Sequence, residues 1–230
     1  MADPDLKAAI AGDARAARRV AKRKQGPVAA QLAQIAVKTS SQEVANIAGG
    51  ALSRRRKDRA AIPAMRKVLR ATPQTDDILP CWEWVACALG DRKEPEALAA
   101  AISSYRAMPE GRSRYFLLQQ LSNRTQREHK TLRENPAFVR MFMNVMVDSK
   151  DPEVRGVAIW GLCKLAHPRS LVLMLFMLAD KDSYVADIAA CTLVAIGGKR
   201  AIKAVRAYLN KCSDQELVAD LTKQLGKRTS

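Results

Sequence analysis

The sequence predicts an all-α protein, a right-handed α-solenoid of about six stacked antiparallel helix pairs. The main observation is an internal repeat, in which VANIAGGAL at residues 44–52 returns as VADIAACTL at residues 185–193. Each copy is followed by a second related stretch, AAIPAMRKVL at residues 60–69 and RAIKAVRAYL at residues 200–209. A further copy of the first stretch, DPEVRGVAIWGL, lies about 30 residues before the last one, a spacing typical of two-helix repeats. Because such pairs bury their apolar faces against their neighbours, they stack into a solenoid.

Capping and turn residues divide the chain into individual helices. Asp13 can cap a helix, Gly26 can end it, and Pro27 can begin the next one. No period-two alternation typical of strands persists for more than a few residues. A long polar turn is expected between residues 122 and 136. The expected helices are 13–25, 27–38, 41–53, 60–71, 77–89, 95–107, 113–122, 136–147, 152–166, 169–179, 183–196, 199–210 and 214–225.

We expect one elongated domain over residues 1–230, because a repeat array grows by stacking and needs no linker. Residues 1–40 would form N-terminal basic helices and residues 41–210 the helix-pair repeats, irregular at about 90–136. Residues 211–230 would form a C-terminal capping helix. The longest apolar run, Leu171–Ala179, is too short to span a membrane, and the N-terminus lacks the pattern of a secretory signal. We therefore expect a cytoplasmic protein.

The repeated phrase D-x-x-V-R-x-x-A-x-x-x-L, followed by a short turn and A-I-x-x-L, resembles HEAT-like repeats. Asp151, Val154, Arg155, Ala158 and Leu162 carry the resemblance best. It implies a HEAT-like or armadillo-like superhelix, in which the Asp caps the first helix and the second helices line the concave face. It implies no single activity, because folds of this kind host many unrelated functions.

The sequence offers little catalytic chemistry. Its five cysteines are scattered, none has the C-x-x-C spacing of a metal site, and the two histidines lie far from them. No G-x-S-x-G, H-E-x-x-H or phosphate-loop pattern occurs. We therefore predict no catalytic, cofactor-binding or metal-binding residues.

The charges give the best indication of function. Lys and Arg number 39 against 23 Asp and Glu, for a formal net charge of +16, which favours an acidic partner. Turns inside helix pairs are basic and turns between pairs are acidic, so we expect a positive edge on the solenoid. The basic residues expected to bind a partner from these turns and from the second helices are Arg54, Arg55, Arg56, Lys57, Arg66, Lys67, Arg70, Arg106, Arg140, Lys203 and Arg206.

A cationic stripe marks the first expected helix. Its members share one helix face because they are spaced i, i+3, i+4, i+7 and i+8. Three interpretations stay open: a solvated outer face, a contact with nucleic-acid phosphate, and a contact with an acidic protein or membrane surface. The stripe consists of Arg15, Arg18, Arg19, Lys22 and Arg23.

Two second helices are apolar on nearly every side, and they suggest either buried helices or a Met-rich groove for a partner helix. The groove hypothesis assigns partner contacts to Met143, Met146, Met174 and Met177. Separately, Trp82, Glu83 and Trp84 form an aromatic–carboxylate cluster. Adjacent helical residues point about 100° apart, so core packing by the tryptophans with Glu83 facing solvent is the simpler interpretation.

We expect a non-enzymatic scaffold or adaptor that binds a macromolecular partner, another protein with an acidic or helical surface, through its basic concave surface and edge. The alternative is a DNA-binding protein, because size, basicity and repeats are also similar to the HEAT-like alkylpurine DNA glycosylases. That family's site does not match this sequence residue by residue, so no catalytic residue is carried over. Aromatic residues are not interleaved with the basic clusters, which disfavours base stacking along them.

Overall fold

The computed structural model describes residues 3–24, 26–71, 80–165, 167 and 169–229. These residues form helices and turns without a strand, and they divide into two compact units, residues 1–121 (unit 1) and residues 122–230 (unit 2). The all-α class predicted from the repeats is confirmed. No helix among the described residues is long and apolar enough to cross a membrane.

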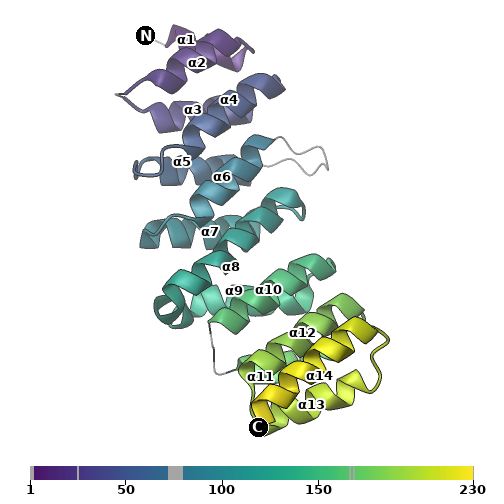
Figure 1. Cartoon of the computed structure of the whole chain (residues 1–230). Helices are drawn as coiled ribbons and strands as arrows, with labels where there is room; N and C mark the ends of the chain where they lie inside the picture. Colours follow the sequence, from purple (N-terminus) through teal and green to yellow (C-terminus); the bar gives the residue numbers. More distant parts are fainter. Residues whose placement is uncertain (1–2, 25, 72–79, 166, 168, 230) are drawn as a thin grey trace. The chain divides into compact units, whose positions relative to one another are not determined.

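In unit 1, consecutive helices run back and forth in two layers (Figure 1). The first helices of each pair contact one another, α2 with α4 and α4 with α6, and so do the second helices, α3 with α5 and α5 with α7. We call these the first-helix layer and the second-helix layer. The helices are Pro4–Ile10 (α1), Ala14–Lys22 (α2), Val28–Lys38 (α3), Gln42–Ser53 (α4), Ala61–Arg70 (α5), Pro80–Gly90 (α6) and Pro95–Ala107 (α7).

Unit 2 repeats the arrangement. Helix α10 contacts α12 and α12 contacts α14, while α11 contacts α13 in the second layer. Helix α8, Arg112–Arg133, carries the chain from residue 121 into this unit. The remaining helices are Pro136–Asp148 (α9), Pro152–Lys164 (α10), Ser170–Met177 (α11), Ser183–Ile196 (α12), Lys199–Leu209 (α13) and Gln215–Thr229 (α14).

Side-chain caps explain why several helices begin where the sequence predicts. The Asp13 carboxylate accepts hydrogen bonds from the backbone N–H groups of Arg15 and Ala16, at 2.7 and 3.1 Å. Asp151 and Asp182 do the same for the first turns of α10 and α12. Each cap satisfies a donor that a helix start leaves unpaired. The acidic residues of these turns are therefore structural as well as charged. Three predicted helix boundaries, at residues 25, 77 and 166, lie outside the described residues.

Two helical features differ from the sequence prediction. Helix α1 was not predicted, although Asp3 caps it and Pro4 begins it. The polar turn expected after residue 122 is wrong, because α8 continues to Arg133 with one non-helical residue at Glu128. Arg124, one of the polar residues that indicated a turn, is buried and pairs with Glu128 at 2.7 Å, while its Nε and Nη1 atoms are buried without a hydrogen-bond partner among the described groups.

Glycines let neighbouring first helices come unusually close. A side chain at Gly49 of α4 would begin 2.4 Å from the Cβ of Cys81 and 3.2 Å from its Cα on α6. Cys81 is itself fully buried, and burial raises the pKa of its thiol to about 12, so it packs as a neutral apolar group. The contact between α4 and α6 thus depends on the absence of a side chain at position 49.

Arginines in the turns of unit 1 connect successive pairs. The Arg55 Nη2 atom donates to the backbone carbonyl of Arg23 at 2.9 Å, and the Arg92 Nη1 atom donates to the carbonyl of Arg55 at 3.1 Å. Arg92 is buried and its second amino group pairs with Glu94 at 2.6 Å. The first bond satisfies the carbonyl of Arg23, the residue that follows α2. The second adds a donor to the carbonyl of Arg55, in the turn after α4, which also accepts the backbone N–H of Asp58 at 3.2 Å. We call this series the arginine ladder.

Candidate functional site

The second-helix layer of unit 1 brings two arginines together on one serine. Arg66 and Arg70 lie one turn apart on α5, so their side chains share a face. Their Nη2 atoms donate to the Oγ atom of Ser103, on the facing helix α7, at 3.1 and 3.3 Å. A serine hydroxyl has two acceptor lone pairs, so it can accept both bonds. We call Arg66, Arg70 and Ser103 the arginine clamp.

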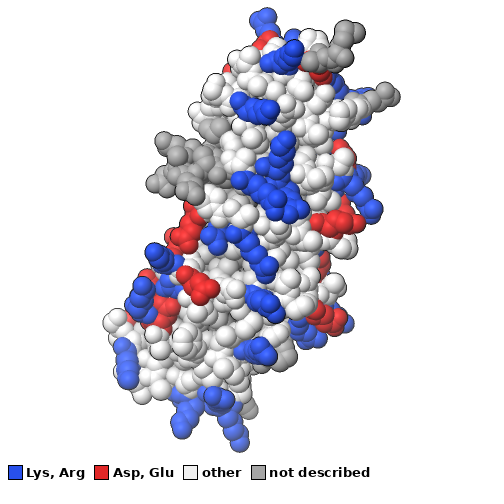
Figure 2. Space-filling view, turned by 180° about the vertical axis from the view of Figure 1, so that it is seen from behind, with Lys and Arg blue, Asp and Glu red and all other residues white. Residues whose placement is uncertain are grey.

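The clamp carries positive charge without a compensating carboxylate. No described Asp or Glu forms an ion pair with Arg66 or Arg70, and the Arg66 Nε atom is buried without a hydrogen-bond partner among the described groups. Lys67 on the same helix and Arg106 on α7 are exposed. Figure 2 shows Lys and Arg gathered along the middle of this face of unit 1, with Asp and Glu toward its sides. An acidic group placed here would gain several charge-assisted hydrogen bonds.

Intramolecular ion pairs neutralise most of the cationic stripe on α2. Arg18 pairs with Glu43 at 2.7 Å and Arg19 pairs with Asp5 at 2.9 Å. Arg23 binds Asp3 and Asp5, and its hydrogen bond to Asp3 holds the pKa of that carboxyl at about 2. The stripe is therefore largely a structural contact between α2 and the segments beside it. Arg15 and Lys22 are exposed and form no ion pair with a described residue.

The basic turn after α4 is also partly structural. Arg55 belongs to the arginine ladder and lies 3.6 Å from the carboxylate of Asp58. Arg56 lies 3.4 Å from a carboxylate oxygen of Asp91. Arg54 and Lys57 are exposed, and neither forms an ion pair with a described carboxylate. In unit 2, the predicted residues Arg140, Lys203 and Arg206 are exposed on α9 and α13.

The predicted methionine groove requires a correction. Met146, Met174 and Met177 are buried, so a partner at the surface could not contact them, and Met143 is half-buried. Helices α9 and α11 each bury one side in unit 2 and leave the other side exposed to solvent, and the three buried methionines lie on the buried sides. The large apolar side chains that α11 does expose are Val172 and Phe176, one turn apart.

The Trp82–Glu83–Trp84 cluster separates into three environments, as adjacent helical positions require. Trp82 is buried and its Nε1 atom donates to the carbonyl of Val68 at 3.1 Å. Glu83 pairs with Arg112 at 2.9 Å. Trp84 is 46% exposed, so it is not the core residue that the sequence predicted.

The sequence offered no indication of Ser103 as a functional residue, because nothing in the local sequence places it opposite residues 66 and 70.

Among the described residues, no group of three or more His, Cys, Asp and Glu side chains is placed to hold a metal ion. The other titratable groups with displaced pKa values are mainly the half-buried thiols of Cys87, Cys163 and Cys191 and the Tyr105 and Tyr208 hydroxyls. Burial raises the pKa of each of these groups. They are protonated at neutral pH and pack as neutral groups.

Comparison with known proteins supports the repeat assignment. Residues 139–226 match the family model of HEAT repeats, and no curated protein matches the chain in sequence. An engineered protein solved by the Northeast Structural Genomics Consortium is similar, with 18% identity, a TM-score of 0.46, and coverage of 96% of this chain and 67% of that one. A designed armadillo repeat protein in complex with the peptide (KR)4 has 14% identity, a TM-score of 0.39, and coverage of 96% and 89%. A second engineered protein has 20% identity, a TM-score of 0.36, and coverage of 97% and 95%.

The matched range contains α10 to α13, including the residues on which the sequence resemblance was based, from Asp151 to Leu193. The predicted resemblance to HEAT-like repeats is thus confirmed, with no single member identified.

Proposed function

We propose that this HEAT-like repeat protein is a non-enzymatic scaffold that binds an acidic segment of another protein on the second-helix layer of unit 1. Helical repeats of this class are typical of protein-binding scaffolds, because their stacked helices present extended surfaces. The observation that carries the proposal is the arginine clamp, in which two guanidinium groups meet at Ser103 without a carboxylate from the described part of the chain.

The chemistry of the clamp favours a carboxylate. Guanidinium groups present planar pairs of N–H donors that match the two oxygens of an Asp or Glu side chain. Arg66 is half-buried, and its hydrogen bond to Ser103 restrains the guanidinium before any partner arrives. Restraint in the free protein lowers the entropy lost on binding. Lys67 and Arg106 would add attraction that steers an acidic segment toward the clamp.

The proposal is tested with a fluorescein-labelled peptide made of alternating Asp and Glu, about 12 residues long, titrated by fluorescence anisotropy. We expect saturable binding, and we expect the double reversal Arg66→Glu/Arg70→Glu to weaken it about 30-fold or more. Losing a hydrogen-bonded charge contact costs about 2–5 kcal/mol, and each 1.4 kcal/mol is a factor of about ten. Affinity should also fall as the salt concentration rises.

The matched control is Lys203→Glu/Arg206→Glu on α13, which changes the net charge by the same amount at exposed positions of unit 2. Equal losses from the two double variants would show that the peptide responds only to overall charge, and the proposal would fail. A labelled duplex of about 20 base pairs tests the DNA alternative. If the duplex binds through Arg66 and Arg70 and excess acidic peptide does not displace it, the partner at this site is nucleic acid and not an acidic protein segment.

A further inference from the structure

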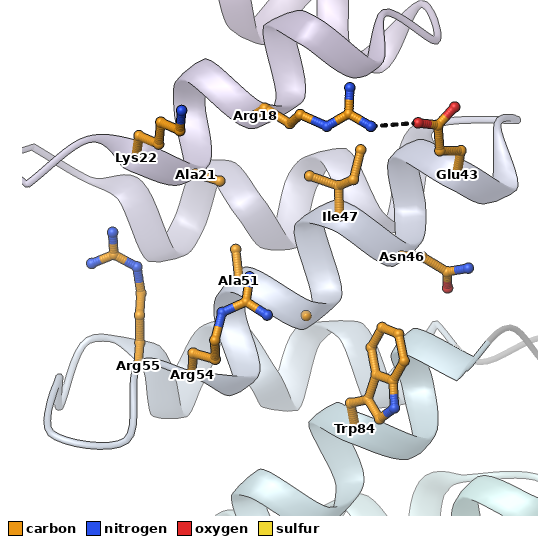
Figure 3. Close-up of a pocket in the computed structure, with 11 residues that line it drawn as sticks. Arg18, Ala21, Lys22, Glu43, Asn46, Ile47, Ala51, Arg54, Arg55 and Trp84 are labelled. Atoms are coloured by element: carbon orange, nitrogen blue, oxygen red, sulfur yellow. Dashed lines mark hydrogen bonds and ion pairs between the residues drawn. The ribbon is translucent and has the colours of Figure 1, made fainter.

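A pocket of about 690 Å³ lies on the first-helix layer of unit 1, and the proposed acidic-segment site does not use it. Its volume is within the range of about 300–1,000 Å³ typical of small-molecule sites. Helix α2 contributes Arg18 and Lys22, α4 with its following turn contributes Glu43, Asn46 and Arg54, and α6 contributes Trp84 (Figure 3). Side chains from three consecutive first helices thus line one open pocket.

One part of the pocket is positively charged. Lys22 and Arg54 are exposed and form no ion pair with a described carboxylate. Arg18 also lines the pocket, but it is paired with Glu43 at 2.7 Å, so the two charges offset each other and the pair adds no net charge to the lining. Figure 3 shows Lys22 and Arg55 on one side of the pocket and Trp84 on the other, with Arg54 between them. The lining therefore offers one free cation, Arg54, near the aromatic ring and a second, Lys22, across the pocket from it.

The aromatic part of the pocket is the exposed indole of Trp84, which packs close to Gly50. The Trp84 ring lies 3.3 Å from the position where a side chain at Gly50 would begin, and the Arg54 Nη1 atom lies 3.6 Å from the same point. The Trp84 indole and the Arg54 guanidinium are therefore neighbours, and both lie over α4 at Gly50, where there is no side chain. An exposed indole of this kind offers a surface for stacking a flat ring.

Asn46 adds a directional donor to this region. Its Oδ1 atom accepts a hydrogen bond from the backbone N–H of Cys81 at 3.2 Å, which fixes the amide orientation. The one hydrogen bond of the Asn46 side chain with a described residue uses its oxygen, so the amide NH₂ group is available, and Asn46 lines the pocket. An amide donor matches the acceptor edge of a nucleobase, as it does in base recognition elsewhere.

We propose that this pocket binds a nucleotide unit, with the base stacked on Trp84 and the phosphate held by Arg54 and Lys22. A nucleotide carries a flat ring with hydrogen-bond acceptors and an anion on the same molecule. Acidic side chains provide the anion but no flat surface to cover the indole, so the lining favours the nucleotide over an acidic peptide. The unit is either a free nucleotide or one residue of a single strand.

The test follows tryptophan fluorescence while AMP is titrated into the full chain, with ribose 5-phosphate as a probe that has the phosphate but no base. AMP should quench the fluorescence saturably and bind more tightly than ribose 5-phosphate. Trp84→Ala should remove the quenching and weaken AMP binding about tenfold or more, measured by calorimetry. Trp84→Phe, which keeps a ring and guards against loss of folding, should retain most of the affinity. Arg54→Glu should weaken both AMP and ribose 5-phosphate.

Two control variants separate the pocket from general effects. Trp160→Ala removes another tryptophan, 43% exposed on α10, and should leave AMP binding unchanged. Arg15→Glu reverses a charge on α2 outside the pocket lining and should also leave it unchanged. Arg66→Glu/Arg70→Glu should weaken acidic-peptide binding as stated above without affecting AMP, so the two proposals fail or succeed independently.

Three outcomes would overturn the nucleotide site. The first is that ribose 5-phosphate binds as tightly as AMP, and the second is that Trp84→Ala leaves the affinity for AMP unchanged. The third is that polyglutamate displaces bound AMP at a concentration below the dissociation constant of AMP. An oligothymidylate of about eight residues distinguishes the two sources of the nucleotide. Tighter binding of this strand than of thymidine monophosphate, with the same dependence on Trp84, identifies a single-stranded nucleic acid. Equal affinity per site for the oligothymidylate and for thymidine monophosphate identifies a free nucleotide.

Discussion

Replacing Gly49 by Ala is expected to lower the free energy of unfolding of unit 1 by about 2–3 kcal/mol. The added Cβ atom would begin 2.4 Å from the Cys81 Cβ and 3.3 Å from the Cys81 carbonyl oxygen. Those neighbours belong to the backbone and to the first side-chain atom of α6, so no rotamer change relieves the overlap. The two helices must move apart, and the cost exceeds the gain of up to about 1 kcal/mol that alanine brings to a helix interior.

Urea unfolding followed by circular dichroism measures this effect, and Gly50→Ala is its matched control. The same Cβ atom at position 50 meets the surface indole of Trp84 at 3.3 Å, and that side chain can shift toward solvent. We expect Gly50→Ala to change stability by less than about 1 kcal/mol. Similar midpoints for the two variants would show that α4 and α6 do not need a glycine at their contact.

Replacing Arg155 by Leu is expected to destabilise unit 2 by about 3–5 kcal/mol. The Arg155 side chain is 4% exposed, and its Nε and Nη2 atoms donate to the two carboxylate oxygens of Asp180 at 3.1 and 2.8 Å. Its Nη1 atom also donates to the carbonyls of Ser149 and Lys150 at 2.9 and 3.2 Å. The substitution leaves the carboxylate, 11% exposed, without its counter-charge.

Thermal and urea unfolding of Arg155→Leu test this expectation against Arg140→Leu, which removes an exposed arginine of the same unit and should change stability by less than about 0.5 kcal/mol. The double variant Arg155→Leu/Asp180→Asn should recover part of the loss, because it removes the unpaired charge and keeps an acceptor for the Asp182 N–H. A loss that does not exceed that of Arg140→Leu would mean that Arg155 is dispensable to the unit.

The helices that could be predicted are those whose signals are local. Asp13, Ser41, Asp151 and Asp182 each cap the helix that the sequence assigned to them, and the repeated phrase places α4 and α12 in equivalent positions. Capping needs only a side chain and the backbone two or three residues further on, so a short stretch of sequence contains all the information.

The candidate sites depend on contacts that no local pattern reports. The Arg18–Glu43 pair joins residues on different helices, and it changes part of a free cationic stripe into a structural contact. The meeting of Arg66 and Arg70 at Ser103 requires the stacking of α5 on α7. The sequence also could not show that Met174 is buried, because a helix that is apolar on all sides has no polar face to mark its exposed side.

The arginine ladder gives the helix stack of unit 1 a chemical direction. In both bonds the later pair supplies the guanidinium and the earlier pair supplies the carbonyl. Shortening the stack from its C-terminal side removes donors and leaves carbonyls that water can satisfy at little cost. Shortening it from the N-terminal side removes acceptors and strands guanidinium donors, of which that of Arg92 is buried. The two ends are therefore not equivalent, and new pairs are more easily gained or lost after the last helices of this unit than before the first.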